Sequence, residues 1–189
     1  MKFNEFYSLT IVHSRDIILV KGVDYMNITK QKSQKTFDKQ AADYDTNIQG
    51  EHARKLYKPI IENLKNKNIH SILDLGCGTG ALLKEIKELN IAEQLFGIDI
   101  SPNMLEIAKN KLGNDATLIL GDSERLPFED NSFDAIVCND SFHHYPLPDI
   151  VAKEVSRCLK QNGVFIIGDC WQPIGARQIM NYYMKHSNS

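Results

Sequence analysis

The feature that most constrains this fold is a short apolar run that gives way to glycines at alternate positions. Residues 72–80 read Ile-Leu-Asp-Leu-Gly-Cys-Gly-Thr-Gly, and an amphipathic segment over residues 81–89 follows at once. Glycine reaches backbone conformations that side chains exclude, and it lets a ligand lie against bare backbone. A helix that starts after such a turn directs unpaired N–H groups and its positive dipole end at the turn. The stretch therefore predicts a strand, a turn that binds a nucleotide-like ligand, and a helix.

The rest of the chain repeats this alternation of strand and helix. Apolar runs predict the strands, and amphipathic segments with serine, proline or glycine at their ends predict the helices. The strands are expected at residues 69–75, 94–99, 117–120, 133–138 and 163–169, and the helices at residues 51–64, 81–89, 102–112, 148–160 and 175–185. Pro59 predicts a kink or a break in the first of these helices. We therefore expect an α/β fold with a doubly wound, mostly parallel sheet.

Polar side chains follow the other strands where each of them ends. Asp99 lies about twenty residues beyond the glycines, where an acid accepts hydrogen bonds from ribose hydroxyls. Asp122 follows the third strand, and Asn139 follows the fourth. Carboxyl ends of parallel strands meet at one edge of a sheet, so these side chains should frame one crevice with the glycine turn. Two adjacent histidines, His143 and His144, follow Asn139, but no third ligand is evident, so the sequence predicts no metal site.

Three segments resemble one family. Residues 74–80, DLGCGTG, resemble the first motif of class I S-adenosylmethionine (SAM)-dependent methyltransferases. Residues 121–134, GDSERLPFEDNSFD, resemble the second motif of the same family. Residues 36–45 resemble the F-D-x-x-A-x-x-Y-D segment that precedes the core of many small-molecule methyltransferases. The resemblance covers about residues 36–169 and implies a Rossmann-like SAM methyltransferase fold.

The resemblance also implies roles for individual residues. Asp99 would hold the ribose, Asp122 would accept the adenine amino group, and Asn139 would contact the methionine part of the cofactor. Tyr44 would close over the reactive end of the cofactor, although packing on the sheet explains this residue equally well. The expected cofactor-binding residues are Tyr44, Asp74, Gly76, Cys77, Gly78, Asp99, Ile100, Met104, Asp122, Ser123 and Asn139, and the catalytic candidates are His143 and His144.

The function that the resemblance implies is SAM-dependent methyl transfer to a small-molecule acceptor, with S-adenosylhomocysteine (SAH) as product. Two alternatives stay open. The chain could bind SAM or SAH without turnover, or it could be an NAD-dependent oxidoreductase, because Gly76, Gly78 and Ala81 also satisfy the G-x-G-x-x-G/A dinucleotide pattern. The acid after the third strand, followed by Leu-Pro-Phe, favours the methyl donor.

Composition excludes several other classes of protein. The chain has 189 residues, a formal net charge of −2 and 42% hydrophobic residues, which is ordinary for a globular domain. The chain has no excess of basic residues that would indicate binding to nucleic acid, and no apolar run in it reaches membrane-spanning length. The four cysteines form no C-x-x-C pair, and no leader segment opens the chain, so we expect a cytoplasmic protein.

The two ends of the chain depart from the family pattern. Residues 1–25 are either a mis-assigned extension before Met26 or a real appendage, residues 26–65 are expected to form a helical cap, and residues 66–189 the SAM-binding domain. The fold normally carries two more strands after the fifth, so the sheet is expected to be truncated there. The fifth strand would then be an exposed apolar edge, which favours a homodimer through that edge.

Overall fold

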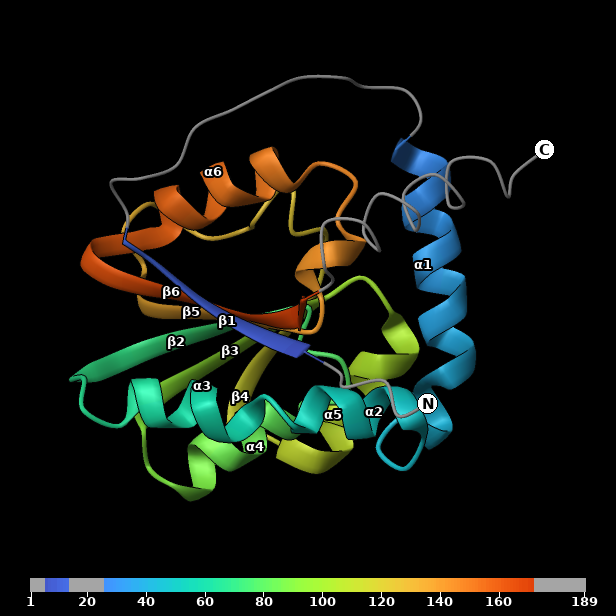
Figure 1. Cartoon of the computed structure of the whole chain (residues 1–189), viewed down its shortest axis with the longest axis horizontal. Helices are drawn as coiled ribbons and strands as arrows, with labels where there is room; N and C mark the ends of the chain where they lie inside the picture. The colour runs from blue at the N-terminus through green and yellow to red at the C-terminus, as the bar shows by residue number, and fades with distance from the viewer. Residues whose placement is uncertain (1–5, 14–25, 172–189) are drawn as a thin grey trace.

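The structure is a computed structural model that describes residues 6–13 and 26–171 (Figure 1). At its centre is one sheet of six strands in the order β1-β6-β5-β2-β3-β4. The strands are β1 (Phe6–His13), β2 (Ile69–Leu75), β3 (Ala92–Asp99), β4 (Ala116–Leu120), β5 (Phe133–Asn139) and β6 (Leu159–Trp171). Strands β2 to β6 are parallel, and the strand order reverses between β2 and β5. The doubly wound α/β prediction is confirmed.

Helices cover both faces of this sheet, with α6 on one face and α3 and α4 on the other (Figure 1). The helices are α1 (Met26–Gln40), η1 (Ala41–Asp43), α2 (Ile48–Arg54), α3 (Tyr57–Leu64), α4 (Ala81–Glu88), α5 (Pro102–Leu112), η2 (Phe142–His144) and α6 (Pro148–Cys158). Consecutive side chains of a strand point to opposite faces, so Ile72 joins the core under α3 and α4 while Leu73 joins the core under α6. Both residues are fully buried, which explains the unbroken apolar run of β2.

Helix α1 lies across the carboxyl ends of the strands (Figure 1). Its C-terminal part is attached to α5, because the Ser101 hydroxyl donates to the Asp38 carboxylate at 2.6 Å and the Asn103 amide donates to the Asp38 carbonyl at 3.0 Å. The segment after η1 is attached to the glycine turn, because the Thr79 hydroxyl donates to Asp45 at 2.6 Å. The N-terminal elements therefore close the region where the strands end.

The prediction that the fifth strand is an exposed edge is wrong. That strand is β6, and β1 pairs with it antiparallel from Phe6↔Trp171 to His13↔Val164. The backbone N–H and C=O groups of this edge are therefore satisfied within the chain. This pairing removes the surface on which a homodimer through β6 was expected.

Two element boundaries also differ from the predictions. The helical segment of residues 51–64 is interrupted at Lys55 and Leu56 rather than at Pro59, which lies in the first turn of α3, where the missing amide hydrogen costs no hydrogen bond. Strand β6 begins at Leu159 instead of residue 163 and contains a register shift against β5. The helix predicted at residues 175–185 lies outside the described residues.

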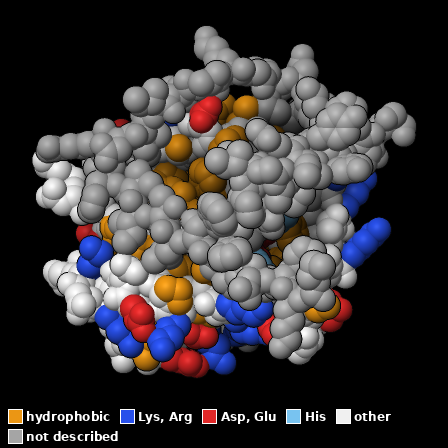
Figure 2. Space-filling model, in the orientation of Figure 1, with side chains coloured by type: hydrophobic (Ala, Val, Ile, Leu, Met, Phe, Trp, Pro, Cys, Tyr) orange, Lys and Arg blue, Asp and Glu red, His pale blue; other side chains and the backbone are white. Residues whose placement is uncertain are grey.

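Charged side chains of both signs are mixed on the lower part of the face in Figure 2. Pairs four residues apart on α3 and α4, Lys58–Glu62 and Lys84–Glu88, are typical of a solvated helix surface. Among the helices of residues 26–171, we find none with the length and apolar character that crossing a bilayer requires.

Candidate active site

One pocket lies at the carboxyl ends of β2 to β5, beneath α1 and η1. Ten of the residues predicted from the sequence line it, and they are Tyr44, Gly76, Gly78, Asp99, Ile100, Met104, Asp122, Ser123, Asn139 and His144. They come from segments that are up to 100 residues apart in the sequence. Their convergence follows from the topology, because parallel strands present their carboxyl ends at one edge of the sheet.

The glycine turn has the conformation that its sequence predicts. Gly76 and Gly78 have φ values of 75° and 51°, in the left-handed region. The amides of Gly76 and Cys77 both donate to the carbonyl of Ile98, at 2.9 and 3.0 Å, and this fixes the turn beside the end of β3. A Cβ atom on Gly76 would lie 2.1 Å from the Ser141 hydroxyl, whereas a Cβ atom on Gly78 would meet no atom within 4 Å among the described residues beyond its two chain neighbours. The turn is thus packed at Gly76 and open toward the pocket at Gly78.

Asp99 connects β3 to this turn. One of its carboxylate oxygens accepts the Gly78 amide at 2.8 Å, and the other accepts the Ser101 amide at 2.8 Å. Desolvation raises the pKa of Asp99, although these backbone donors oppose that effect. The side chain that is expected to hold a ribose therefore also shapes the turn beneath it.

Asp122 also lines the pocket and lies in the loop after β4. One of its oxygens accepts the Glu124 amide at 2.9 Å, and the other contacts the Lys30 ammonium of α1 at 2.6 Å. Lys30 also pairs with the Glu124 carboxylate. Burial opposes the charge on Lys30, but the two carboxylates outweigh this effect and raise its pKa. The sequence did not indicate Lys30 or Glu124 as site residues.

Asp74, which precedes the turn, and Cys77, which lies within it, line a smaller pocket with Tyr44, Tyr57 and Asn139. Asp74 is only 2% exposed, and its Oδ1 atom has no hydrogen-bond partner among the described residues. Desolvation, together with the negative charge of Asp99, raises the pKa of Asp74 to about 8. A buried carboxyl group with an unpaired oxygen is suited to receive a cationic group from a ligand.

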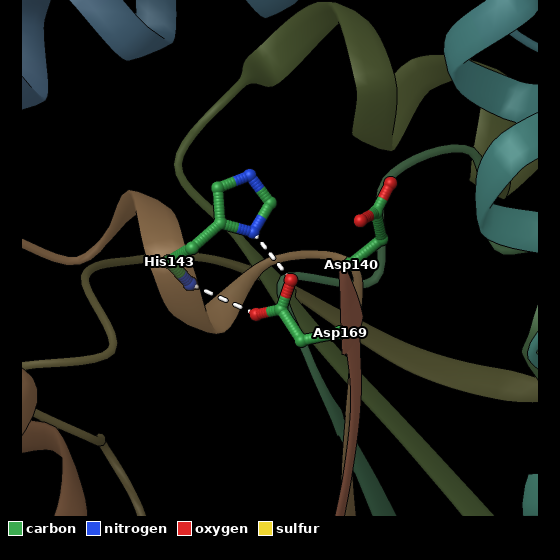
Figure 3. A group of neighbouring side chains, drawn as sticks. All are labelled: Asp140, His143 and Asp169. Atoms are coloured by element: carbon green, nitrogen blue, oxygen red, sulfur yellow. Dashed lines mark hydrogen bonds and ion pairs between the residues drawn. The ribbon is translucent and has the colours of Figure 1, made fainter. Parts of the chain in front are cut away.

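The two adjacent histidines have different surroundings. The backbone amide of His143 donates to one oxygen of Asp169 at 3.0 Å, and the His143 Nδ1 atom is 2.6 Å from the other oxygen (Figure 3). Burial lowers the pKa of His143, but Asp169 and Asp140 outweigh this effect and raise it. Partial desolvation and the adjacent His143 lower the pKa of His144 to about 4, so His144 is neutral at neutral pH.

His143, Asp140 and Asp169 offer donor atoms that lie within 4.8 Å of one another, which is the spacing of candidate metal ligands (Figure 3). The His143 Nδ1 atom is already hydrogen-bonded to Asp169, and the Asp140 Oδ2 atom lies 3.1 Å from the His52 Nδ1 atom. We therefore interpret the cluster as two histidine–carboxylate pairs at the ends of β5 and β6. His143 does not line the main pocket, but its ring lies 3.9 Å from that of His144, which does.

Aromatic rings form one wall of the pocket. Phe37 packs edge-on against Tyr44 at 6.4 Å and against His144 at 5.1 Å, measured between ring centroids. Desolvation, with the nearby Asp140, Asp99 and Asp45 carboxylates, raises the pKa of Tyr44 to about 12. The phenol of Tyr44 therefore stays protonated in the physiological range.

Tyr145 is a further site residue that the sequence did not indicate. Its hydroxyl lies 3.0 Å from the Ser141 hydroxyl and 3.2 Å from the Ser123 hydroxyl, so it connects the segments that follow β4 and β5. A Cβ atom on Gly76 would lie 3.0 Å from the same hydroxyl. No motif marks this residue, since its role depends on three segments meeting in space.

Comparisons with known proteins agree with this geometry. A family profile described as "Methyltransferase domain" matches residues 73–167. The chain is 32% identical over 163 residues to the demethylmenaquinone methyltransferase of Thermotoga maritima, a match that covers 83% of this chain and 71% of the relative.

Solved structures show the same fold. The YcgJ protein of Bacillus subtilis superposes with a TM-score of 0.60 at 27% identity, covering 73% of this chain and 58% of that protein. A phosphoethanolamine N-methyltransferase of Haemonchus contortus, in complex with phosphoethanolamine and SAH, superposes with a TM-score of 0.67 at 16% identity, covering 78% of this chain and 34% of that protein. The chain thus spans little more than half of the first of these structures, and a third of the second.

Proposed function

We propose a function for this site from the premise that the chain belongs to the class I SAM-dependent methyltransferases. The proposal is that the pocket binds SAM and that the chain transfers its methyl group to a small molecule. The observation that carries the proposal is that Asp99, Asp122 and the glycine turn line one pocket. The relatives support the acceptor class, since demethylmenaquinone and phosphoethanolamine are both small molecules.

The donor and acceptor groups of the pocket fit the cofactor. Asp99 would accept from the ribose hydroxyls while it keeps its bonds to the Gly78 and Ser101 amides. Asp122 would accept from the adenine amino group, next to the buried Ser123. At the other end, the unpaired Asp74 oxygen would receive the ammonium of the methionine part, with Asn139 beside it. Met104, which is 1% exposed, and Ile100 would supply apolar contact to the adenine.

When bound, SAM supplies an electrophilic methyl group on a sulfonium. The chain mainly has to exclude water and to align an acceptor with that methyl group. Positioning of this kind lowers the activation free energy by roughly several kcal/mol. Phe37, Tyr44 and His144 form the wall that would exclude water. His143, held by Asp169, is the more basic of the two rings, since the low pKa of His144 makes His144 a weak base, but His143 reaches the pocket only through its contact with the His144 ring.

Calorimetry tests the cofactor assignment. We expect SAM and SAH to bind and NAD to give no heat of binding, because SAM and SAH carry an α-ammonium group that can pair with Asp74 and NAD does not. Binding of NAD without SAH would support the oxidoreductase alternative and contradict the proposal. An assay for SAH formation with a panel of phenols, amines and thiols then separates an enzyme from a chain that binds without turnover. The His143→Gln variant tests the proposed role of this histidine. SAH formation by the variant should fall, and its affinity for SAH should stay unaltered.

The buried Asp74 predicts that cofactor binding depends on pH. Its pKa of about 8 means that the carboxyl group is protonated at neutral pH in the unliganded protein, and a ligand ammonium should lower that pKa. We therefore expect SAH binding to release a proton and to tighten between pH ~6 and pH ~8, by at most about tenfold per pH unit. Calorimetry in buffers of different ionisation enthalpy measures that proton.

The Asp74→Asn variant provides the matched comparison. It should bind SAH more weakly and without the pH dependence, because asparagine does not titrate. In the unliganded wild type, the folded-state pKa of Asp74 lies above its unfolded value, so its contribution to stability falls as the pH rises from about 4 to about 8. The free energy of unfolding of the Asp74→Asn variant, measured with urea, should lack the part of the decrease with pH that Asp74 causes in the wild type. A flat SAH affinity from pH ~6 to pH ~8 in the wild type would refute the assignment.

A further inference from the structure

The loop after β4 holds two carboxylates against one ammonium. The Lys30 Nζ atom lies 2.6 Å from the Asp122 carboxylate and also pairs with the carboxylate of Glu124. The side chain of Lys30 is 17% exposed, and those of Asp122 and Glu124 are 39% and 9% exposed. Lys30 also lines the cofactor pocket, so this ion pair lies inside the region that a ligand would fill.

Both oxygens of Asp122 are engaged. One accepts the Glu124 amide at 2.9 Å, and the other contacts Lys30. An adenine amino group that approaches Asp122 carries partly positive hydrogens, so it meets an oxygen that a full positive charge already occupies. Two such donors repel each other at hydrogen-bond distance. Binding of the adenine should therefore displace the ammonium from Asp122.

Glu124 provides a second position for that ammonium. Its side chain is nine-tenths buried, and its Oε1 atom has no hydrogen-bond partner among the described residues. A buried carboxylate with a free oxygen can take up the hydrogen bond that Lys30 loses at Asp122. The helix that carries Lys30 need not move away, because Asp38 attaches it to Ser101 and Asn103 independently of Lys30.

From these contacts we propose that Lys30 is a residue of the cofactor site that competes with the adenine amino group for Asp122. Lys30 bridges Asp122 and Glu124 in the structure, and on cofactor binding it leaves Asp122 and stays paired with Glu124. Lys30 thereby weakens cofactor binding, and Glu124 limits that effect. The inference rests on the proposed function, since it takes Asp122 as the partner of the adenine.

Calorimetry with SAH, which requires no acceptor, tests this competition. Lys30→Met keeps the apolar stem and removes the charge, and it should tighten SAH binding about three- to tenfold. Lys35→Met, on an exposed position of the same helix, is the matched control and should leave the affinity unchanged. Glu124→Gln should weaken SAH binding about threefold in the wild type and have no effect when Lys30 is already methionine.

Two further readouts separate competition from a general structural effect. Salt screens the ion pair, so SAH affinity should rise from about 50 mM to about 500 mM NaCl in the wild type relative to Lys30→Met. Hydrogen exchange in the N-terminal half of α1, which Asp38 does not anchor, should not speed up when SAH binds to the wild type, because Glu124 retains Lys30.

The outcomes of these tests are distinct. If Lys30→Met binds SAH more weakly than Lys35→Met, or equally well, the competition is refuted. If the wild type binds no SAH at all, the proposed function itself fails. If SAH binding to the wild type speeds the exchange of α1, the transfer of Lys30 to Glu124 is wrong.

Discussion

Replacing Asp99 with asparagine is expected to weaken SAH binding about 100-fold, or ~2.7 kcal/mol. The carboxylate accepts two backbone amides, those of Gly78 and Ser101, and is proposed to accept ribose hydroxyls as well. Asparagine has one acceptor oxygen and one donor nitrogen, so one of the two amides would face another donor. The loss thus includes a contact to the ligand and the shape of the turn that supports it. Isothermal titration with SAH measures the effect.

Glu93→Gln is the matched control for this change. Glu93 lies on the same strand, β3, but its side chain is 75% exposed and contacts His70 rather than the pocket. Its substitution should leave SAH affinity unaltered. An Asp99→Asn variant whose SAH affinity stays within about threefold of the wild type would show that the carboxylate does not hold the ligand.

Replacing Gly76 with alanine is expected to lower the free energy of unfolding by about 3 kcal/mol. Alanine would have to adopt the left-handed backbone conformation of Gly76. Its Cβ atom would lie 2.1 Å from the Ser141 hydroxyl and 3.0 Å from the Tyr145 hydroxyl. The contact cannot relax easily, because Tyr145 is hydrogen-bonded to both Ser141 and Ser123. Urea unfolding measures the loss. Adding Ser141→Gly removes the nearest atom, so the double variant should recover part of the stability.

Gly78→Ala should behave in the opposite way. Alanine at a φ of 51° costs about 1 kcal/mol of stability, and its Cβ atom would meet none of the described residues within 4 Å apart from its two chain neighbours. Because Gly78 lines the pocket, that Cβ atom would project into the proposed cofactor site, and SAH affinity should fall at least about tenfold. Equal unfolding free energies for the Gly76→Ala and Gly78→Ala variants would contradict the packing described for the turn.

Local sequence patterns predicted most of the sheet. Strand β2 has the predicted bounds, and β3, β4 and β5 begin or end within two residues of the expected positions. Short apolar runs mark these strands, and the helices between them are amphipathic, so each element is recognisable from its own residues. The boundaries that differed depend on neighbours in space. Leu159 became a strand residue because it pairs with Phe133 of β5.

The positions of the predicted site residues follow from the same logic. Asp99, Asp122 and Asn139 end successive parallel strands or directly follow them, so the topology brings them to one edge once the sheet forms. Asp74 was also predicted, but its burial with an unpaired oxygen, and therefore its high pKa, depends on what packs around it. His143 and His144 are adjacent in sequence, yet only the structure assigns Asp169 to one of them and the pocket to the other.

The sequence by itself determined the order of strands and helices, the conformation of the glycine turn and the strand ends at which polar side chains gather. These features depend on hydrophobic periodicity and on the backbone freedom of glycine, which are local properties. Only the tertiary structure decided that β1 covers the edge of β6, that Lys30 reaches Asp122 from 92 residues away and that Tyr145 braces the turn. Contacts of this kind leave no periodic signal in the sequence, because each arises from packing between segments that are distant along the chain.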